Sequence, residues 1–267
     1  MPAAIDYSPL THPVPAPTRT NTTAYAVSRL AEVNGWEYCT HAVAQPLPGV
    51  VFREPDGRPR SSQRSVNIVR IPGSPSIEIG DSFYAEIAQG NQYTRTWGYA
   101  AVDLGVDAPS LTVEARSNRR LSPLPATPAG AVQDERHPGV LVEAAPGSEQ
   151  DADSLLTTET VAALGDQTYP LNLELAGRWL FLYAPRSLST DDAESWRHVL
   201  HTVDLVVRRM REWHPAGAHS PSGTSNRTHA REARDARVNG RRVAWQLSLL
   251  AVAMVGGAVA ALIIGGR

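Results

Sequence analysis

The sequence predicts an α+β fold with a mainly antiparallel sheet, a few helices packed on it, and one C-terminal transmembrane helix. Apolar and polar residues alternate with the two-residue period of strands in several segments, as in Leu111–Ala115. Apolar residues over 193–210 have the three- and four-residue spacing of a helix that packs on a sheet. Finally, Val243–Ile264 is a run of 22 residues without an ionisable side chain.

The composition is that of a chain that folds around a sizeable core. Of its 267 residues, 42% are hydrophobic and 19% charged, and the formal net charge is −2. This length corresponds to one domain with attachments or to two small domains. The single cysteine, Cys39, excludes an intramolecular disulfide framework and a multi-cysteine zinc or iron–sulfur site.

The first half of the chain predicts a helix followed by strands. Residues 1–22 are rich in Pro and Thr and predict a disordered N-terminal arm. Tyr25–Val33 predicts a short helix, because Asn34-Gly35 is a common helix stop. An extended stretch begins at Trp36. The later strands are expected at Val66–Ile71, Ile77–Ile79, Phe83–Ile87, Thr96–Leu104 and Leu111–Ala115, and Ser117–Arg136 is expected to be a loop.

The second half contains the clearest local patterns. Val140–Ala144 is a short apolar strand, and a helix capped by Asp153 or Ser154 is expected to run to Leu164, with Gly165 as its stop. Residues 171–175 and 179–183 are separated by a short turn around Gly177 and predict a hairpin.

The longest helix is expected to open at Ser189-Thr190 and to end in arginines at 208, 209 and 211, which its dipole favours. Its apolar side chains predict one face that packs on the sheet. They are Ala193, Trp196, Val199, Leu200, Val203, Val206, Val207 and Met210.

The apolar run at 243–264 predicts a membrane span that acts as a tail anchor. As a helix it covers about 33 Å, against a hydrocarbon core of about 30 Å. In lipid, a helix satisfies its own backbone hydrogen bonds, so a run this apolar is more stable inserted than in water. Only Gly265, Gly266 and Arg267 follow it.

The charges on the two sides of this run predict its orientation. Six arginines precede it against two acidic residues, a balance of +4, and Arg267 alone follows it. By the positive-inside rule, the N-terminal domain lies in the cytoplasm, at the cell (plasma) membrane. Arg241, Arg242 and Trp245 are expected at the membrane interface, because guanidiniums and an indole ring suit the headgroup level.

These patterns divide the chain into four parts. We expect a disordered arm at 1–22, an α+β domain at 23–213, a basic flexible linker at 214–242 and the transmembrane helix at 243–264. Residues 1–213 carry 18 arginines and 25 acidic residues, a balance of −7. An acidic head argues against nucleic-acid binding, which needs a basic face. The basic linker is expected to bind anionic lipid headgroups.

Two stretches resemble a family of actinobacterial membrane-associated proteins, an uncharacterised family with a terminal transmembrane helix. They are Ile77–Asn118, which contains the motifs "EIG" and "WGY", and Val140–Arg186, with a strand, a helix and a hairpin. The residues that carry the likeness are Glu78, Gly80, Tyr84, Trp97, Gly98, Tyr99, Pro109, Asn118, Glu174 and Tyr183. The chain departs from the family pattern at Asp81, Ser110 and Thr158. The resemblance implies an architecture and a membrane setting, and it implies no catalytic residues.

Known catalytic and nucleotide-binding motifs are absent from the sequence, so we expect no catalytic, cofactor-binding or metal-binding residues and no cofactor. Glu194, His198 and His201 have a metal-like helical spacing, but the apolar stripe places them on the solvated face. Three weaker sets remain. They are the carboxylates at 149, 151 and 153, the charge set Glu78, Asp81, Glu86 and Arg95, and the aromatic residues Trp36, Tyr38, Trp97, Tyr99, Trp179 and Tyr183.

For each of these sets the structural interpretation competes with a functional one. The aromatic residues are expected in the core, and the alternative is an aromatic-lined ligand or peptide groove. Within the span, small residues recur every fourth position at Ala253, Gly257, Ala261 and Gly265, which permits close helix–helix packing. Because Ala and Gly are abundant in this chain, chance alignment is a serious competing explanation.

The sequence therefore predicts a single-pass, tail-anchored protein whose cytoplasmic α+β domain is a non-enzymatic interaction or scaffold module. Its expected partners are membrane lipids, contacted through the helix and the linker, and a basic protein or a second copy of the chain. The alternative is a membrane-anchored, hydrolase-like enzyme without a recognisable motif. A further alternative reverses the topology and places the domain outside the cell.

Overall fold

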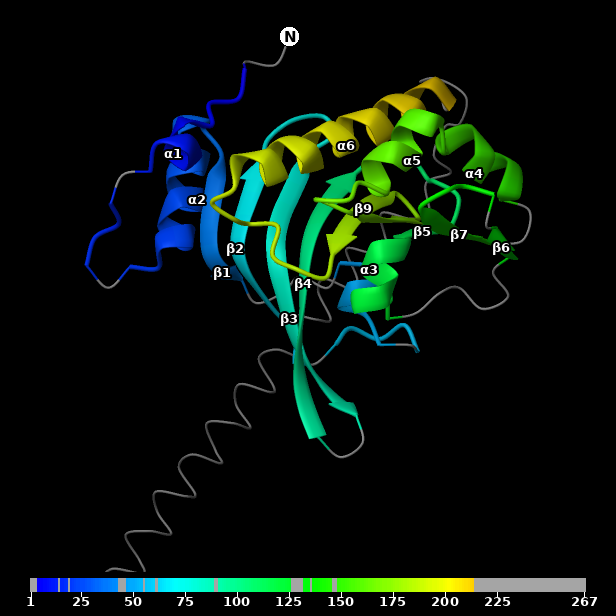
Figure 1. Cartoon of the computed structure of the whole chain (residues 1–267), viewed down its shortest axis with the longest axis horizontal. Helices are drawn as coiled ribbons and strands as arrows, with labels where there is room; N and C mark the ends of the chain where they lie inside the picture. The colour runs from blue at the N-terminus through cyan, green and yellow to red at the C-terminus, as the bar shows by residue number, and fades with distance from the viewer. Residues whose placement is uncertain are drawn as a thin grey trace, which may run out of the picture. The chain divides into compact units, whose positions relative to one another are not determined.

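The computed structural model describes most of the chain up to residue 213. The described residues are 4–13, 15–18, 20–42, 47–54, 56–60, 62–88, 91–125, 132–134, 136–145 and 148–213. The chain divides into two units at residues 216 and 217, and the second unit lies outside the described residues. Figure 1 shows the first unit as a twisted sheet with its longest helix along one side.

Within the described residues, nine strands form one sheet in the order β1-β2-β3-β4-β9-β8-β5-β7-β6, and every neighbouring pair is antiparallel. Their bounds are β1 Glu37–Ala42, β2 Arg64–Ile71, β3 Ile77–Ala88, β4 Asn91–Asp103, β5 Leu111–Ala115, β6 Val132–Asp134, β7 Val140–Ala144, β8 Asn172–Ala176 and β9 Trp179–Ala184. The predicted α+β fold with a mainly antiparallel sheet is confirmed.

The helices are short except for α2 and α6. Their bounds are α1 Ser8–Thr11, α2 Thr22–Val33, α3 Arg116–Leu121, α4 Glu149–Leu155, α5 Thr158–Leu164 and α6 Ala193–Trp213, with a 3₁₀ turn η1 at Val50–Phe52. Figure 1 shows α6 lying along the sheet with α4 and α5 beside it, and α1 and α2 at the β1 end.

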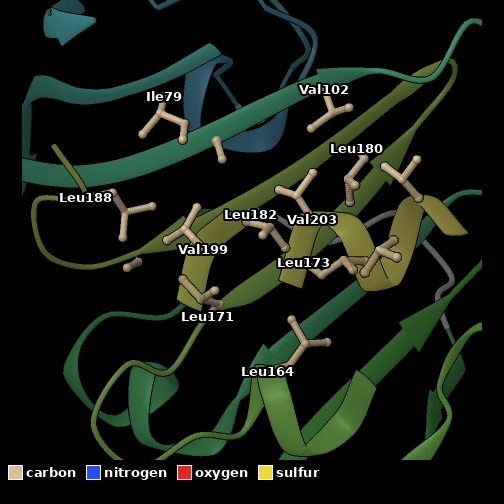
Figure 2. Close-up of a cluster of buried hydrophobic side chains, with 14 of the residues drawn as sticks. Ile79, Val102, Leu164, Leu171, Leu173, Leu180, Leu182, Leu188, Val199 and Val203 are labelled. Carbon is tan, nitrogen blue, oxygen red and sulfur yellow. The ribbon is translucent and has the colours of Figure 1, made fainter. Parts of the chain in front are cut away.

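The main core lies between α6 and the sheet. The stripe predicted for this helix is buried, with Trp196 at 1% exposure and Val206 at 0%, and only Leu200 is partly buried. Figure 2 shows Val199 and Val203 among leucines of β8 and β9 such as Leu173 and Leu182. Burying apolar surface on this scale is the main stabilising contribution to the domain.

The hairpin of β8 and β9 lies between β4 and β5, so the chain leaves the first four strands and returns to pair beside them. Tyr99 of β4 is opposite Tyr183 of β9, and Val113 of β5 is opposite Leu173 of β8. The hairpin was predicted from its alternation, and the structure confirms it with a tight turn at Gly177-Arg178.

The segment after β9 crosses the sheet at Gly98. The N–H of Gly98 donates to the carbonyl of Arg186 at 2.8 Å. A Cβ atom at this position would lie 2.5 Å from both that carbonyl oxygen and the backbone nitrogen of Leu188. Opposite Gly98, the buried carboxylate of Asp81 accepts the N–H of Leu188 at 2.8 Å. Glycine at 98 therefore permits the close crossing, and Asp81 holds it in place.

The other face of the sheet carries a second, aromatic core. Phe52 of η1 packs edge-on against Tyr99 at 5.0 Å between ring centroids and lies near Phe181 and Tyr183. At Gly49 an added Cβ would lie 2.0 Å from the Tyr183 hydroxyl oxygen, so the segment before η1 needs glycine to approach the sheet.

This second core corrects the expectation that the alternating strands are half-buried. Thr112 and Glu114 of β5 are 2% and 3% exposed, and Glu174 of β8 is 5% exposed. The two carboxylates are tolerated because both have partners. Glu114, for example, accepts the N–H of Leu124 at 2.6 Å and pairs with Arg119.

Several element boundaries also differ from the sequence prediction. The predicted disordered arm contains α1, whose Leu10 is buried. Asp6, which precedes α1, forms two hydrogen bonds with Asn34 at the end of α2. The predicted single helix up to Leu164 is two helices, α4 and α5, and the cap of the second is Thr157. A long strand, β3, replaces the two expected between 77 and 87.

Local pairing and capping account for the other differences. Residues 117–136, expected as a loop, include most of α3 and all of β6, which pairs with β7. Asp153, predicted as a helix cap, lies within α4, and its carboxylate forms an ion pair with Arg136 at 2.8 Å.

The predicted transmembrane helix at 243–264 lies outside the described residues. Among the residues that the structure describes, no helix combines the length and apolar character needed to cross a membrane.

Candidate functional site

The aromatic face of the sheet contains a cavity of about 600 Å³, here called the groove. Its lining includes Glu37, Leu47, Arg70, Glu78, Tyr99 and Trp179. This volume lies within the range of ligand pockets. The groove lies over β1 to β4 and the start of β9, on the side of the sheet opposite α6.

Strand register places the charged residues of the groove in one row. Glu37 of β1 is opposite Arg70 of β2, Arg70 is opposite Glu78 of β3, and Glu78 is opposite Ala101 of β4. Directly opposite residues of antiparallel strands present their side chains on the same face. A bulge in β2 between Val66 and Val69 lets both Ser65 and Arg70 face the groove.

Arg70 bridges the two carboxylates of this row. Its Nε donates to Glu78 Oε2 at 2.8 Å and its Nη1 to Glu37 Oε1 at 3.0 Å. The hydrogen bond with Glu78 raises the pKa of Arg70 above its ordinary value, although burial opposes the shift. The side chains of Arg70 and Glu37 are 41% and 59% exposed, so both are open to solvent and to a ligand.

Tyr99 fixes the second oxygen of Glu78. Its hydroxyl donates to Glu78 Oε1 at 2.9 Å, and the residue is 1% exposed. Burial, followed by the negative charge of Glu78, raises the pKa of Tyr99 well above its ordinary value. The phenol therefore stays protonated and serves as a fixed donor that orients Glu78.

The walls of the groove are largely apolar. Trp179 stacks on Phe181 with ring centroids 6.0 Å apart and an interplanar angle of 18°, which fixes its ring at the edge of the groove. Leu47, Ile68 and Ala101 complete this part of the lining. An apolar wall beside a few oriented polar groups is the usual arrangement of a binding site.

Cys39 lies beside the charged row on β1. Its Sγ contacts Glu37 Oε1 at 3.4 Å and Arg70 Nη1 at 4.0 Å. Burial, followed by the hydrogen bond with Glu37, raises the pKa of the Cys39 thiol. Since the thiolate is the reactive form, this environment does not activate the cysteine as a nucleophile.

The charge set expected at Glu78, Asp81, Glu86 and Arg95 is separated by the structure. Glu86 and Arg95 form a cross-strand ion pair at 2.5 Å toward the end of the β3–β4 hairpin. Glu78 faces the groove, whereas Asp81 lies on the opposite face, 2% exposed, beneath the segment after β9. Burial raises the pKa of Asp81 to about 6. The four residues therefore do not form one site.

The helical set Glu194, His198 and His201 does not form a metal site among the described residues. Glu194 and His201 are exposed, as predicted. His198 is half-buried, which corrects its expected place on the solvated face. Its Nε2 lies 3.0 Å from the carbonyl of Ala163 in α5, and burial lowers its pKa.

The six aromatic residues are mostly part of the core. Trp97, Tyr99 and Tyr183 are buried, and Trp36 and Tyr38 are half-buried against the main core. Two of the six, Tyr99 and Trp179, also line the groove. The core interpretation therefore holds for most of the set, and an aromatic-lined ligand groove stays a prediction.

The predicted membrane residues lie outside the described part of the chain. They are the interface residues Arg241, Arg242 and Trp245 and the helix-packing residues Ala253, Gly257, Ala261 and Gly265. Their roles stay predictions.

Sequence reasoning singled out Glu78, Tyr99 and Trp179 but missed Arg70 and Leu47. Arg70 shares a face of the sheet with Glu78 because the two residues are directly opposite each other. This can be recognised only when the register of β2 and β3 is known. Nothing in the local sequence indicates that Leu47 meets the sheet, because this contact depends on the irregular segment before η1.

Comparison with known proteins adds no assignment to this geometry. No protein-family profile, no curated protein and no solved structure matches the chain.

Proposed function

We propose that this chain is a membrane-tethered binding protein, held by residues 243–264 and presenting the groove of its α+β head to a protein partner at the cytoplasmic face of the cell membrane. The observation that carries the proposal is the groove itself, a cavity of about 600 Å³ with apolar walls and a row of oriented charges. The ion pairs of Arg70 with Glu37 and Glu78 are partly exposed, and pairs of this kind add little to stability.

The tether is supported by the sequence. A run of 22 residues without an ionisable group is long enough to span the hydrocarbon core. The six arginines before it favour the cytoplasmic side for the head. A protein of this design concentrates its binding groove at a surface and meets partners that are themselves at the membrane.

The lone cysteine allows a direct test of the groove. Cys39 adjoins Glu37 and Arg70, so a thiol-directed photocrosslinker on the full chain places its reactive group only there. We expect crosslinking in native membranes to capture a discrete protein. Filling the groove with Ala42→Trp should abolish the product.

The control moves the cysteine to the far side of the head. In Cys39→Ser with Glu212→Cys, the probe is on the exposed end of α6, and the product should be absent. A product unchanged by Ala42→Trp, or equally strong from position 212, would contradict a binding role for the groove.

A further inference from the structure

The charges of the groove are not balanced by its own residues. Among the described lining residues, Glu37 and Glu78 supply two carboxylates and Arg70 supplies one guanidinium. One negative charge therefore remains at the floor of the cavity, in a head whose balance is −7. A bound anion would be repelled by this charge, and a bound cation would neutralise it.

The existing contacts indicate the kind of cation that fits. Arg70 already lies in the row and donates one hydrogen bond to each carboxylate. Both oxygens of Glu78 have donors, from Arg70 and from Tyr99. Glu37, at 59% exposure, is the more open carboxylate and the one that an incoming donor reaches.

The walls favour a peptide segment rather than an isolated cation. Leu47 and Trp179 provide apolar contact at the β9 end of the groove. Strand order places Trp179 four strands from Glu37, a distance of roughly 19 Å. A segment spans this distance when an arginine or lysine binds the carboxylate and a neighbouring apolar residue reaches the far wall. A simple metal ion would use none of these walls.

We infer that the groove binds a basic protein segment, with the charged end of an arginine or lysine at Glu37 and a neighbouring apolar side chain of the same segment against Trp179 and Leu47. The inference rests on the proposed binding role of the groove and names the chemistry of its occupant. The volume of about 600 Å³ leaves room for the neighbouring residues of such a segment. A lipid headgroup is a poorer occupant, because phosphate oxygens would meet the two carboxylates.

The test compares peptides that differ only in charge. The full chain in a non-ionic detergent is titrated against a labelled Leu-Arg-Leu-Arg-Leu peptide, and against the same peptide with citrulline, the neutral isostere, in place of arginine. We expect the arginine peptide to bind at least about tenfold more tightly, and its binding to weaken as salt rises.

Three variants locate the effect. Glu37→Gln should reduce the affinity for the arginine peptide about tenfold and leave that for the citrulline peptide unchanged. Glu212→Gln removes an exposed carboxylate of α6 outside the groove and should change neither. Ala42→Trp should block both peptides.

The outcomes separate this inference from the binding role on which it rests. If both peptides bind equally, and Ala42→Trp blocks both, the groove is a binding site but the inferred cation is wrong. If the arginine peptide fails to bind, or if Glu37→Gln leaves its affinity unchanged, the inference is overturned. The Cys39 crosslinking experiment decides the binding role independently.

Discussion

The hydroxyl of Tyr183 donates to the carboxylate of Glu174 at 2.8 Å, entirely within the aromatic core. The same carboxylate accepts the backbone N–H of Val50 at 2.9 Å, which fastens η1 to β8 and β9. Burial raises the pKa of Glu174 to about 7, and the hydrogen bonds oppose the shift. The titratable carboxyl of Glu174 therefore holds η1, and the chain just before η1 lines the groove at Leu47.

This buried carboxyl predicts a stability that falls as pH rises. The folded-state pKa of Glu174, about 7, exceeds its ordinary value of 4.5, and that of Asp81, about 6, exceeds 3.8. Between these values the folded state binds more protons than the unfolded state, so the free energy of unfolding decreases as pH rises toward the folded-state pKa. From pH 4.5 to 8, we expect a loss on the order of a few kcal/mol.

Urea unfolding of the full chain in detergent, followed by tryptophan fluorescence, measures this loss. Glu174→Gln keeps an acceptor for Val50 and removes the titration, so its stability should depend less on pH and exceed that of the wild type at pH 8. A midpoint of Glu174→Gln that changes with pH as much as the wild-type midpoint would show that Glu174 does not carry this loss.

The close crossing at Gly98 predicts a severe effect of a single methyl group. In Gly98→Ala the new Cβ would lie 2.5 Å from two backbone atoms of the segment after β9, which must then move. We expect a loss of at least about 2 kcal/mol in the free energy of unfolding. Gly35→Ala is the control, since Gly35 has φ +68° and no atom within 4 Å of an added Cβ. It should cost only about 1 kcal/mol.

The helix break between α4 and α5 predicts a specific capping effect. Thr157 accepts the N–H of Thr160 through its hydroxyl, so Thr157→Ala should cost about 1 kcal/mol of stability. The neighbouring Thr158→Ala removes an exposed hydroxyl within α5 and should be nearly neutral. Equal effects of the two substitutions in thermal unfolding would argue for one continuous helix.

The main core predicts a large difference between two leucines. Leu182 of β9 is 0% exposed beneath α6, so Leu182→Ala should cost roughly 2–5 kcal/mol because the cavity left behind cannot collapse fully. Leu121 at the end of α3 is 75% exposed, and Leu121→Ala should change stability by less than about 0.5 kcal/mol. Denaturant titration of both variants gives the comparison. Similar losses would place Leu121 in a contact that buries it.

Elements with strong local patterns were predictable from the sequence. The bounds of β5 and β7 agree with the prediction, because a short alternating or apolar run has few other ways to fold. The buried face of α6 follows from its spacing, with Trp196, Val203 and Val206 all buried. These signals depend only on neighbours along the chain.

The second core and the groove were not predictable in this way. Alternation indicates that Glu174 and Leu173 face opposite sides, but it does not indicate that Phe52 and Gly49 cover the side of Glu174. Likewise, the pairing of Arg70 with Glu37 and Glu78 depends on the register of three strands and on the bulge of β2. Contacts between residues that are far apart in the sequence cannot be recognised from the pattern of neighbouring residues.

Membrane attachment by residues 243–264 is the central claim of this account, and alkaline carbonate extraction tests it most directly. Membranes from cells that make the full chain are washed at high pH and sedimented, alongside a variant with Val255→Arg in the middle of the apolar run. We predict that the full chain stays in the membrane pellet and that the variant is retained less well, because a central arginine costs about 2.5–3.5 kcal/mol in a membrane helix. Release of the intact full chain into the supernatant would contradict the claim.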